Sequence, residues 1–151
     1  MFSTTADLNS TAPIWIESGT ATPVISFNGA SVGVTYTCQI FRWTRIGSLC
    51  FFDGRVTLSS KGSSTGVLRI GAGALPYPSI DSNMSGHEVS IRLNNFSAGT
   101  GATDLVGDVI AGTSTPYLRV FLYISGTASG MTQASLTDTS DIIFNGMYRV
   151  A

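Results

Sequence analysis

Residues 34–58 decide the fold of this chain and read VTYTCQIFRWTRIGSLCFFDGRVTL. Two long runs of β-branched and aromatic residues are broken only at Ile46-Gly47-Ser48, which is the pattern of a long antiparallel hairpin. No other stretch carries apolar residues at this density, so the hydrophobic core is expected to form around the hairpin. Aromatic residues fall on both faces of the two strands. We therefore expect a second sheet to cover one face and a neighbouring subunit to cover the other.

The rest of the chain consists of shorter runs typical of strands, separated by segments rich in Gly, Ser, Thr and Pro. No window of eleven or more residues has an uninterrupted helical apolar period, so almost no helix is expected. This pattern predicts an all-β fold, an antiparallel β-sandwich of jelly-roll type. Residues 1–12 are interpreted as a polar tail or linker stub, and residues 13–151 as a single domain. The strands expected outside the hairpin are 13–16, 22–27, 67–70, 88–93, 104–110, 117–125, 131–136 and 141–150.

The composition is poor in charge and rich in apolar residues. Charged residues make up 11% of 151, against about 25% in typical soluble domains, and the mean hydropathy is +0.27. No window approaches the roughly 18 apolar residues of a membrane helix, so no membrane insertion is expected and the apolar excess should lie in the core and in a subunit interface. The net charge of −1, without basic clusters, argues against a nucleic-acid partner. The first residues lack the basic and apolar regions of a signal peptide, so export by that route is not expected.

Two cysteines, Cys38 and Cys50, flank the proposed turn. If Ile46 faces Ser48 across it, Cys38 faces Val56, and the two sulfurs are offset along the ribbon by too much for a disulfide. Both cysteines are then interpreted as small buried apolar side chains. A bulge that shifts the register would bring a disulfide back within reach.

Nucleophile and metal motifs are weak. Residues 62–66 (GSSTG) match the nucleophile-elbow pattern, but that mechanism requires a following helix and a nearby histidine. The only histidine, His87, belongs to a different loop, so a hairpin loop is expected at 62–66. One histidine and two cysteines in apolar strands do not make a metal cluster, and Asp104 and Asp108 do not have the spacing of a calcium loop. Structural or solvated roles are expected for His87, Asp104 and Asp108.

The carboxylates are scattered along the chain, whereas glycoside hydrolysis requires two carboxyl groups at a defined separation. Asp53 lies within the hairpin and is expected to form an ion pair or a turn bond at a strand bulge, with Arg42 or Arg45 as the partner. We therefore expect a protein without catalytic residues, metal or cofactor.

The richest candidate binding surface lies in the loops after the hairpin, where short polar groups come close to aromatic residues. Sugar recognition uses this mixture, because a planar ring stacks on the apolar face of a pyranose while Asn, Asp and His bind the hydroxyl groups. Loops on a rigid β scaffold are also where binding residues collect. Ordinary turn chemistry explains many of the same residue types and stays open as the alternative. The candidate carbohydrate-binding residues are Tyr77, Asp81, Asn83, His87, Asn94, Asn95 and Asp104.

Six short phrases of the sequence belong together: RWTRIGSL at 42–49, GRVTL at 54–58, KGSSTG at 61–66, LPY at 75–77, PVISF at 23–27 and FNGMY at 144–148. They resemble a module of bacteriophage tail fibres and tailspikes. The match covers about two-thirds of the chain. Ser48 stands where the module usually has Asn, and residues 72–75 lengthen the segment before Pro76.

The resemblance implies a jelly-roll head, usually homotrimeric, that closes the fibre and often binds cell-surface glycans. The expected function is that of a trimeric tail-fibre or tailspike tip that binds host polysaccharide or lipopolysaccharide during adsorption. The rest of the fibre would lie N-terminal to it. The expected location is the virion tail fibre, made in the host cytoplasm and acting outside the cell. Two alternatives stay open: a trimerisation and folding clamp without ligand, and a small glycan hydrolase or esterase.

Overall fold

The computed structural model describes residues 15–71, 75–78, 87–97, 102–110, 117–124 and 127–150. Residues 1–12, expected to form a tail, lie outside this part of the chain. The described residues form strands and one short 3-10 helix. The elements are β1 (Ile16–Ala21), β2 (Ile25–Phe27), β3 (Val34–Ile46), β4 (Leu49–Lys61), β5 (Leu68–Ile70), β6 (His87–Phe96), β7 (Ala102–Val109), β8 (Leu118–Ile124), β9 (Thr127–Gly130), η1 (Gln133–Ser135) and β10 (Leu136–Arg149).

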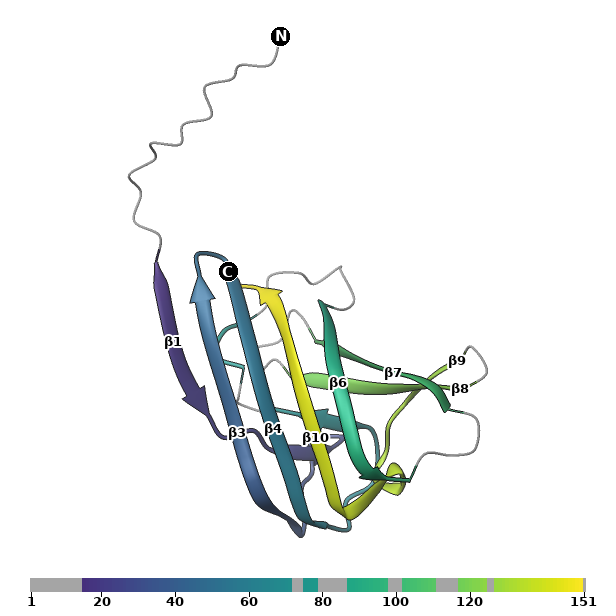
Figure 1. The fold of residues 1–151 in the computed structure, drawn as a ribbon. Coiled ribbons are helices and arrows are strands. Elements are labelled where there is room, and N and C mark those ends of the chain that lie inside the picture. Colours follow the sequence, from purple (N-terminus) through teal and green to yellow (C-terminus); the bar gives the residue numbers. More distant parts are fainter. Residues whose placement is uncertain are drawn as a thin grey trace, which may run out of the picture.

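All strands belong to one curled antiparallel sheet, which confirms the all-β expectation. The order is β1-β3-β4-β10-β6-β7-β8-β5-β2, and β9 pairs with β8. In Figure 1 the strands β1, β3, β4, β10 and β6 lie side by side, and β7 and β8 cross behind β6 and extend beyond it. We call these first five strands the front layer. No helix among the described residues is long and apolar enough to cross a membrane.

The central hairpin is present, but its register differs from the expected one. Ile46 pairs with Leu49, so the turn consists of the two residues Gly47 and Ser48. Gly47 adopts a φ of 58°, the left-handed conformation that a two-residue hairpin turn with glycine first requires. Ile46 therefore does not face Ser48, and Cys38 faces Thr57 rather than Val56.

This register places the two cysteines on opposite faces of the sheet. Cys50 is buried in the core, whereas Cys38 is half-buried on the other side, and both are free thiols. The expectation of no disulfide is confirmed, and the interpretation as a buried apolar side chain holds for Cys50. It is wrong for Cys38.

Three short segments differ from the sequence-based expectations. The first described strand is β1, Ile16–Ala21, rather than 13–16. Its composition hides it, because Ser18, Gly19 and Thr20 offer little apolar pattern; Gly19 is small enough to lie under the Trp43 ring, whose nearest atom would be 2.6 Å from an added Cβ. The strand expected at 131–136 is largely the 3-10 helix η1, and β9 was not expected.

Aromatic rings fill the core beneath β3, β4 and β10. Phe41 and Phe52 stack with ring centroids 5.7 Å apart, and Phe144 lies 6.1 Å from Phe41 and 6.4 Å from Phe52. The Phe144 ring occupies the space that a Cβ at Gly54 would need. Along β4, residues from Leu49 to Leu58 thus alternate between this core and the opposite face.

Side chains of β3 join the front layer to β2, the last strand of the curled sheet, and to the segment just before it. The Tyr36 hydroxyl on β3 accepts a hydrogen bond from the Ile25 N–H at 2.9 Å and donates to the Ile25 carbonyl at 3.4 Å. Gln39 Nε2 donates to the Pro23 carbonyl at 2.8 Å. Burial raises the pKa of Tyr36, which keeps the phenol protonated. We call this junction the side-chain seam.

Replacement of Tyr36 by Phe is expected to leave the buried Ile25 N–H without a partner, at a cost of about 1–3 kcal/mol in the free energy of unfolding. Urea unfolding followed by circular dichroism measures this. Tyr117→Phe is the matched control, because the Tyr117 hydroxyl has no hydrogen bond among the described residues while its ring stays under Arg69. Equal stability of both variants would contradict the role of the seam.

Candidate ligand-binding face

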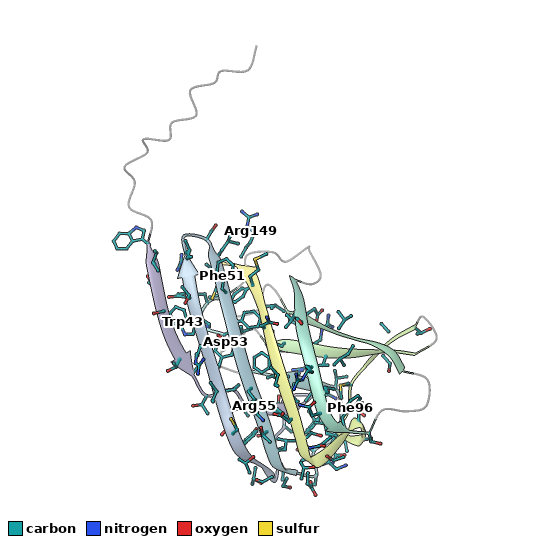
Figure 2. All side chains as sticks on the ribbon, viewed as in Figure 1. Trp43, Phe51, Asp53, Arg55, Phe96 and Arg149 are labelled. Carbon is teal, nitrogen blue, oxygen red and sulfur yellow. The ribbon has the colours of Figure 1, made fainter. Side chains whose placement is uncertain are left out.

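The side of the front layer that points away from the core is here called the outer face. Strand alternation and the observed pairing arrange its side chains in rows across the strands. Figure 2 shows Phe51, Asp53 and Arg55 following one another along β4. The row nearest the turn holds Ile16, Ile46, Leu49 and Arg149, and the second row holds Ser18, Thr44, Phe51 and Met147. The third row holds Thr20, Arg42, Asp53, Asn145 and Ser90. The fourth row holds Ile40, Arg55, Ile143 and Arg92, and the fifth holds Cys38, Thr57, Asp141 and Asn94.

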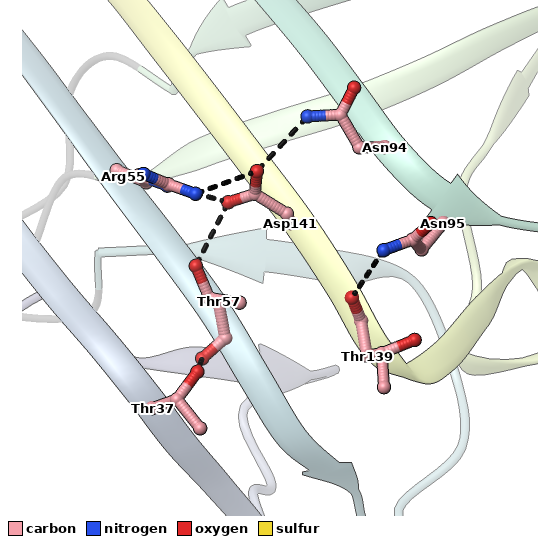
Figure 3. Close-up of polar contacts among 7 residues, drawn as sticks. All are labelled: Thr37, Arg55, Thr57, Asn94, Asn95, Thr139 and Asp141. Carbon is pink, nitrogen blue, oxygen red and sulfur yellow. Dashed lines mark hydrogen bonds and ion pairs between the residues drawn. The ribbon is translucent and has the colours of Figure 1, made fainter.

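Asp141 is the most strongly bonded group of the outer face (Figure 3). Arg55 donates from Nε to Oδ1 at 2.8 Å and from Nη2 to Oδ2 at 3.2 Å. The Thr57 hydroxyl donates to Oδ1 at 2.9 Å, and Asn94 Nδ2 donates to Oδ2 at 3.0 Å. The hydrogen bonds from Arg55 lower the pKa of Asp141 against the opposing effect of burial, with further lowering by Asn94 and Thr57. The carboxylate is therefore charged and fully bonded.

A second ion pair crosses the hairpin one row away from Arg55. Arg42 Nη1 lies 3.9 Å from Asp53 Oδ2, and the side chains are 65% and 61% exposed. The expected pairing of Asp53 is confirmed, with Arg42 as the partner. Arg45 instead points its Nε to the Gly47 carbonyl at 2.7 Å. Because both members of the Arg42–Asp53 pair face water, their interaction is weak and either is available to a ligand.

Two adjoining hollows cross the outer face and share Asp53 and Asn145; together we call them the outer furrow. The larger, of about 820 Å³, lies where β6 leaves β10 to pair with β7. The smaller, of about 430 Å³, crosses β3, β4 and β10. Each is within the range of about 300–1,000 Å³ usual for ligand sites. The larger is lined by Phe51, Met147, Ser90 and Leu105 among others, and the smaller by Ile40, Arg42, Arg55 and Ile143.

The furrow combines the groups that bind sugars. Phe51 is 40% exposed, which is unusual for an aromatic side chain and leaves its ring open to an apolar surface. Asp53, Asn145 and Ser90 beside it carry acceptors and donors suited to hydroxyl groups. The arrangement can therefore hold a ring with one apolar face and several hydroxyl groups at its edge.

Tyr77, a candidate from the sequence, lies on the core side of the front layer and not in the furrow. Its ring meets Trp43 edge-on at 5.4 Å between centroids, and the Arg45 guanidinium lies 4.7 Å above it. Its hydroxyl donates to Glu17, and this bond raises the pKa of Tyr77. The Tyr148 hydroxyl accepts from the Tyr77 N–H and donates to its carbonyl. Most of the binding capacity of Tyr77 is thus already used within the protein.

Asn94 and Asn95 lie at the far end of β6. Asn94 is part of the Asp141 network, whereas Asn95 adopts a φ of 53° and donates to the Thr139 carbonyl at 3.3 Å. The Asn94 row lies five residues along β3 from Trp43, which is roughly 17 Å at strand spacing. The structure therefore does not bring Tyr77 and the two asparagines together. Asn95 instead has a structural role within β6, at the irregularity where the register against β10 shifts.

The remaining candidates are described only in part. Asp81 and Asn83 lie outside the described residues. His87 begins β6 opposite Val109, and Asp104 lies on β7 opposite Tyr123, so their strand positions are known.

The other motifs have structural roles where the structure describes them. Asp108 accepts from Arg119 at 2.7 Å and 3.2 Å, the structural role expected for it. The described residues contain no group of three metal-ligating side chains. Residues 62–66 connect β4 to β5, which do not pair, so the expectation of a hairpin loop is wrong. Ser64 is buried there and accepts a hydrogen bond from the Val32 N–H at 2.9 Å.

Sequence reasoning missed the residues of the furrow. The aromatic residues on both faces of the hairpin, Phe51 among them, were expected to be covered by a second sheet or a neighbouring subunit, and Met147 and Asn145 were not singled out. The alternation within 49–55 and 141–149 carried the missing signal, since Phe51, Asp53 and Arg55 share a face with Asn145. Reading it required the correct register of the hairpin and the pairing of β4 with β10.

Comparison with known proteins gives a likeness of fold. No protein-family model matches the chain, and no curated protein matches it. A solved structure, that of the Dettilon tailspike protein (gp208), superimposes with a TM-score of 0.67 at 18% sequence identity. The match covers 90% of this chain and 24% of the tailspike, so the chain corresponds to about a quarter of that protein's length. The chain therefore shares its fold with part of a phage tailspike.

Asp141→Asn is expected to lower the free energy of unfolding at pH 7 by about 1.5–3 kcal/mol, because hydrogen bonds to a charged acceptor are lost. The pKa of Asp141 in the folded protein lies below its usual value of about 3.9 in the unfolded chain. At a pH between these two pKa values the unfolded chain binds more protons than the folded protein. The stabilisation is therefore fully present above about pH 4 and is lost as the pH falls through the folded-state pKa. Urea unfolding at pH 7 and pH 3 should show a smaller pH effect in the variant. Asp53→Asn is the control, expected to cost below about 0.5 kcal/mol; equal losses would contradict the assignment.

Proposed function

We propose that this chain is the tip domain of a bacteriophage tail fibre or tailspike, a homotrimer of jelly-roll type that binds glycans on the host cell surface. The likeness of 90% of the chain to part of a tailspike carries the proposal. The tail-module phrases at 42–49 and 54–58 support it independently, since they build the hairpin and its turn. The rest of the fibre would precede the domain in the chain.

The outer furrow is the proposed glycan site. It presents an exposed ring, a carboxylate, an amide and a hydroxyl on one rigid sheet, which is how a binding site stays ordered without ligand. The loop residues expected from the sequence, Asp81 and Asn83 among them, would at most extend it. The proposed role is adhesion without catalysis, and the host ligand would be a polysaccharide or lipopolysaccharide.

Trimerisation would raise the overall affinity of the protein for its glycan. Single sugar sites are weak, but linked copies raise the effective concentration of each next site, so the combined affinity can exceed one site by about 10²–10⁴-fold. The corner of the outer face near the turn is the proposed subunit contact. Ile16 is 66% exposed there and pairs with Ile46, which is 42% exposed, in the same row; Trp15, 71% exposed, directly precedes Ile16 in the chain. Such apolar groups together mark an interaction surface.

Replacement of Phe51 by Ala should abolish adsorption of the labelled protein to host cells, because the stacking surface of the furrow is removed. Flow cytometry over a panel of candidate hosts measures it. Val32→Ala, which trims another exposed apolar residue that does not line the furrow, should adsorb like the wild type. Tyr77→Ala separates the furrow from the loop region: loss of adsorption in that variant alone would move the site to the loops. Absence of adsorption by every form would favour the trimerisation clamp.

The wild-type protein should have three times the chain mass of 15.8 kDa in light scattering at micromolar concentration. Ile46→Glu should shift it toward the monomer, because a charge would be buried in the proposed contact. Val32→Glu adds the same charge at another exposed position and should remain trimeric. A stable wild-type monomer would rule out the trimer.

A further inference from the structure

We propose, building on the proposed glycan-binding function, that the outer furrow selects acidic saccharides, whose negative charge comes from carboxylate or phosphodiester groups. The observation behind it is an uneven distribution of charge. The five rows described above hold four of the eight basic residues of the chain, Arg42, Arg55, Arg92 and Arg149, and two of the nine acidic ones, Asp53 and Asp141. Glu88, two positions before Ser90 on β6, is not counted in these rows. The five rows thus have a net charge of +2 in a chain whose net charge is −1.

Three of these arginines can reach a ligand. Arg42 is largely exposed, and its 3.9 Å pair with Asp53 is long and open to water. Arg55 is 52% exposed, and its Nη1 has no hydrogen bond among the described residues. Arg92 is exposed and has no ion pair within the described part of the chain. The guanidinium fork matches planar carboxylates and phosphate oxygens alike.

The spacing of these three arginines suits a saccharide chain that runs across the strands. Arg42 and Arg55 line the smaller hollow, on adjacent strands and adjacent rows. Arg92 lies in the Arg55 row two strands further, about 10 Å away at the usual strand spacing, with Ile143 between them. A polymer lying along this row would pass both guanidinium groups and an apolar residue, and it would reach Phe51 through the shared residues Asp53 and Asn145.

Asp141 prepares Arg55 for this role. Its carboxylate is bonded by Arg55, Thr57 and Asn94, so it has little capacity left to repel or bind a ligand. It holds the Nε and Nη2 edge of Arg55 against the sheet and leaves the Nη1 edge outward. Asp141 is thus a positioning residue, and Asp53 is the one exposed carboxylate in the described furrow.

The test measures binding of the full chain to a uronic-acid-containing bacterial capsular polysaccharide and to its carboxyl-reduced form, which keeps the linkages but is neutral. A phosphodiester-linked polymer identifies the second source of charge. Wild-type protein should bind at least one acidic polymer about tenfold or more tightly than the neutral form, consistent with one charged hydrogen bond, and more weakly at high salt. Arg42→Gln combined with Arg92→Gln should remove that preference, so that the variant binds the acidic and the neutral polymer equally.

Arg69→Gln is the control, because Arg69 lies on β5, outside the front layer, and its removal changes the charge without touching the furrow. Equal binding of acidic and neutral polymers by the wild type would overturn the inference while glycan binding stands. An equal loss in Arg69→Gln and the furrow variant would also overturn it, since net charge alone would then explain the effect. Absence of binding to every polymer would overturn the inference, and the proposed function fails only if adsorption to host cells is absent as well.

Discussion

The two-residue turn at Gly47 and Ser48 is the constraint on which the rest of the structure depends. Side chains alternate between the faces of a strand, so a slip of one residue would exchange the two faces of β4. In the observed register Phe52 and Val56 enter the core, and Phe51, Asp53 and Arg55 face outward. The pairing of β4 with β10 then extends the same assignment across the sheet. The same register therefore places the core residues on one face of the sheet and the candidate site on the other.

The sequence was sufficient for the parts of the fold that depend on local pattern. The long hairpin, the all-β class and the ion pair of Asp53 follow from apolar runs, turn residues and neighbouring charges. The exact register did not follow, because Ile46-Gly47-Ser48 allows turns of different length and only the backbone of Gly47 distinguishes them. Strands such as β1 and β9 were hidden because pairing with a neighbouring strand, not their own composition, makes them strands.

The candidate site was hard to foresee for a different reason. Its residues come from β3, β4, β6, β7 and β10, which meet only through pairing between distant segments. Polar residues in loops invite a functional reading, yet Tyr77 and Asn95 are engaged in internal hydrogen bonds. Outward residues of long strands look ordinary one at a time. Only the pairing of the strands shows that arginines, an exposed ring and an amide lie close together on one face.

The side-chain seam has a consequence for how the molecule opens. Elsewhere, neighbouring strands are joined by ladders of backbone hydrogen bonds, but β2 is a three-residue strand held to β5 on one side and by Tyr36 on the other, with Gln39 bonded to Pro23 just before it. Apart from the buried side chains of Ile25 and Phe27, few interstrand hydrogen bonds hold it, while the β3–β4–β10 ladders are long. Local opening is therefore expected to begin at the seam, with amide protons near Ile25 exchanging before those of the central hairpin. The front layer, which carries the furrow, is therefore expected to stay ordered while β2 opens.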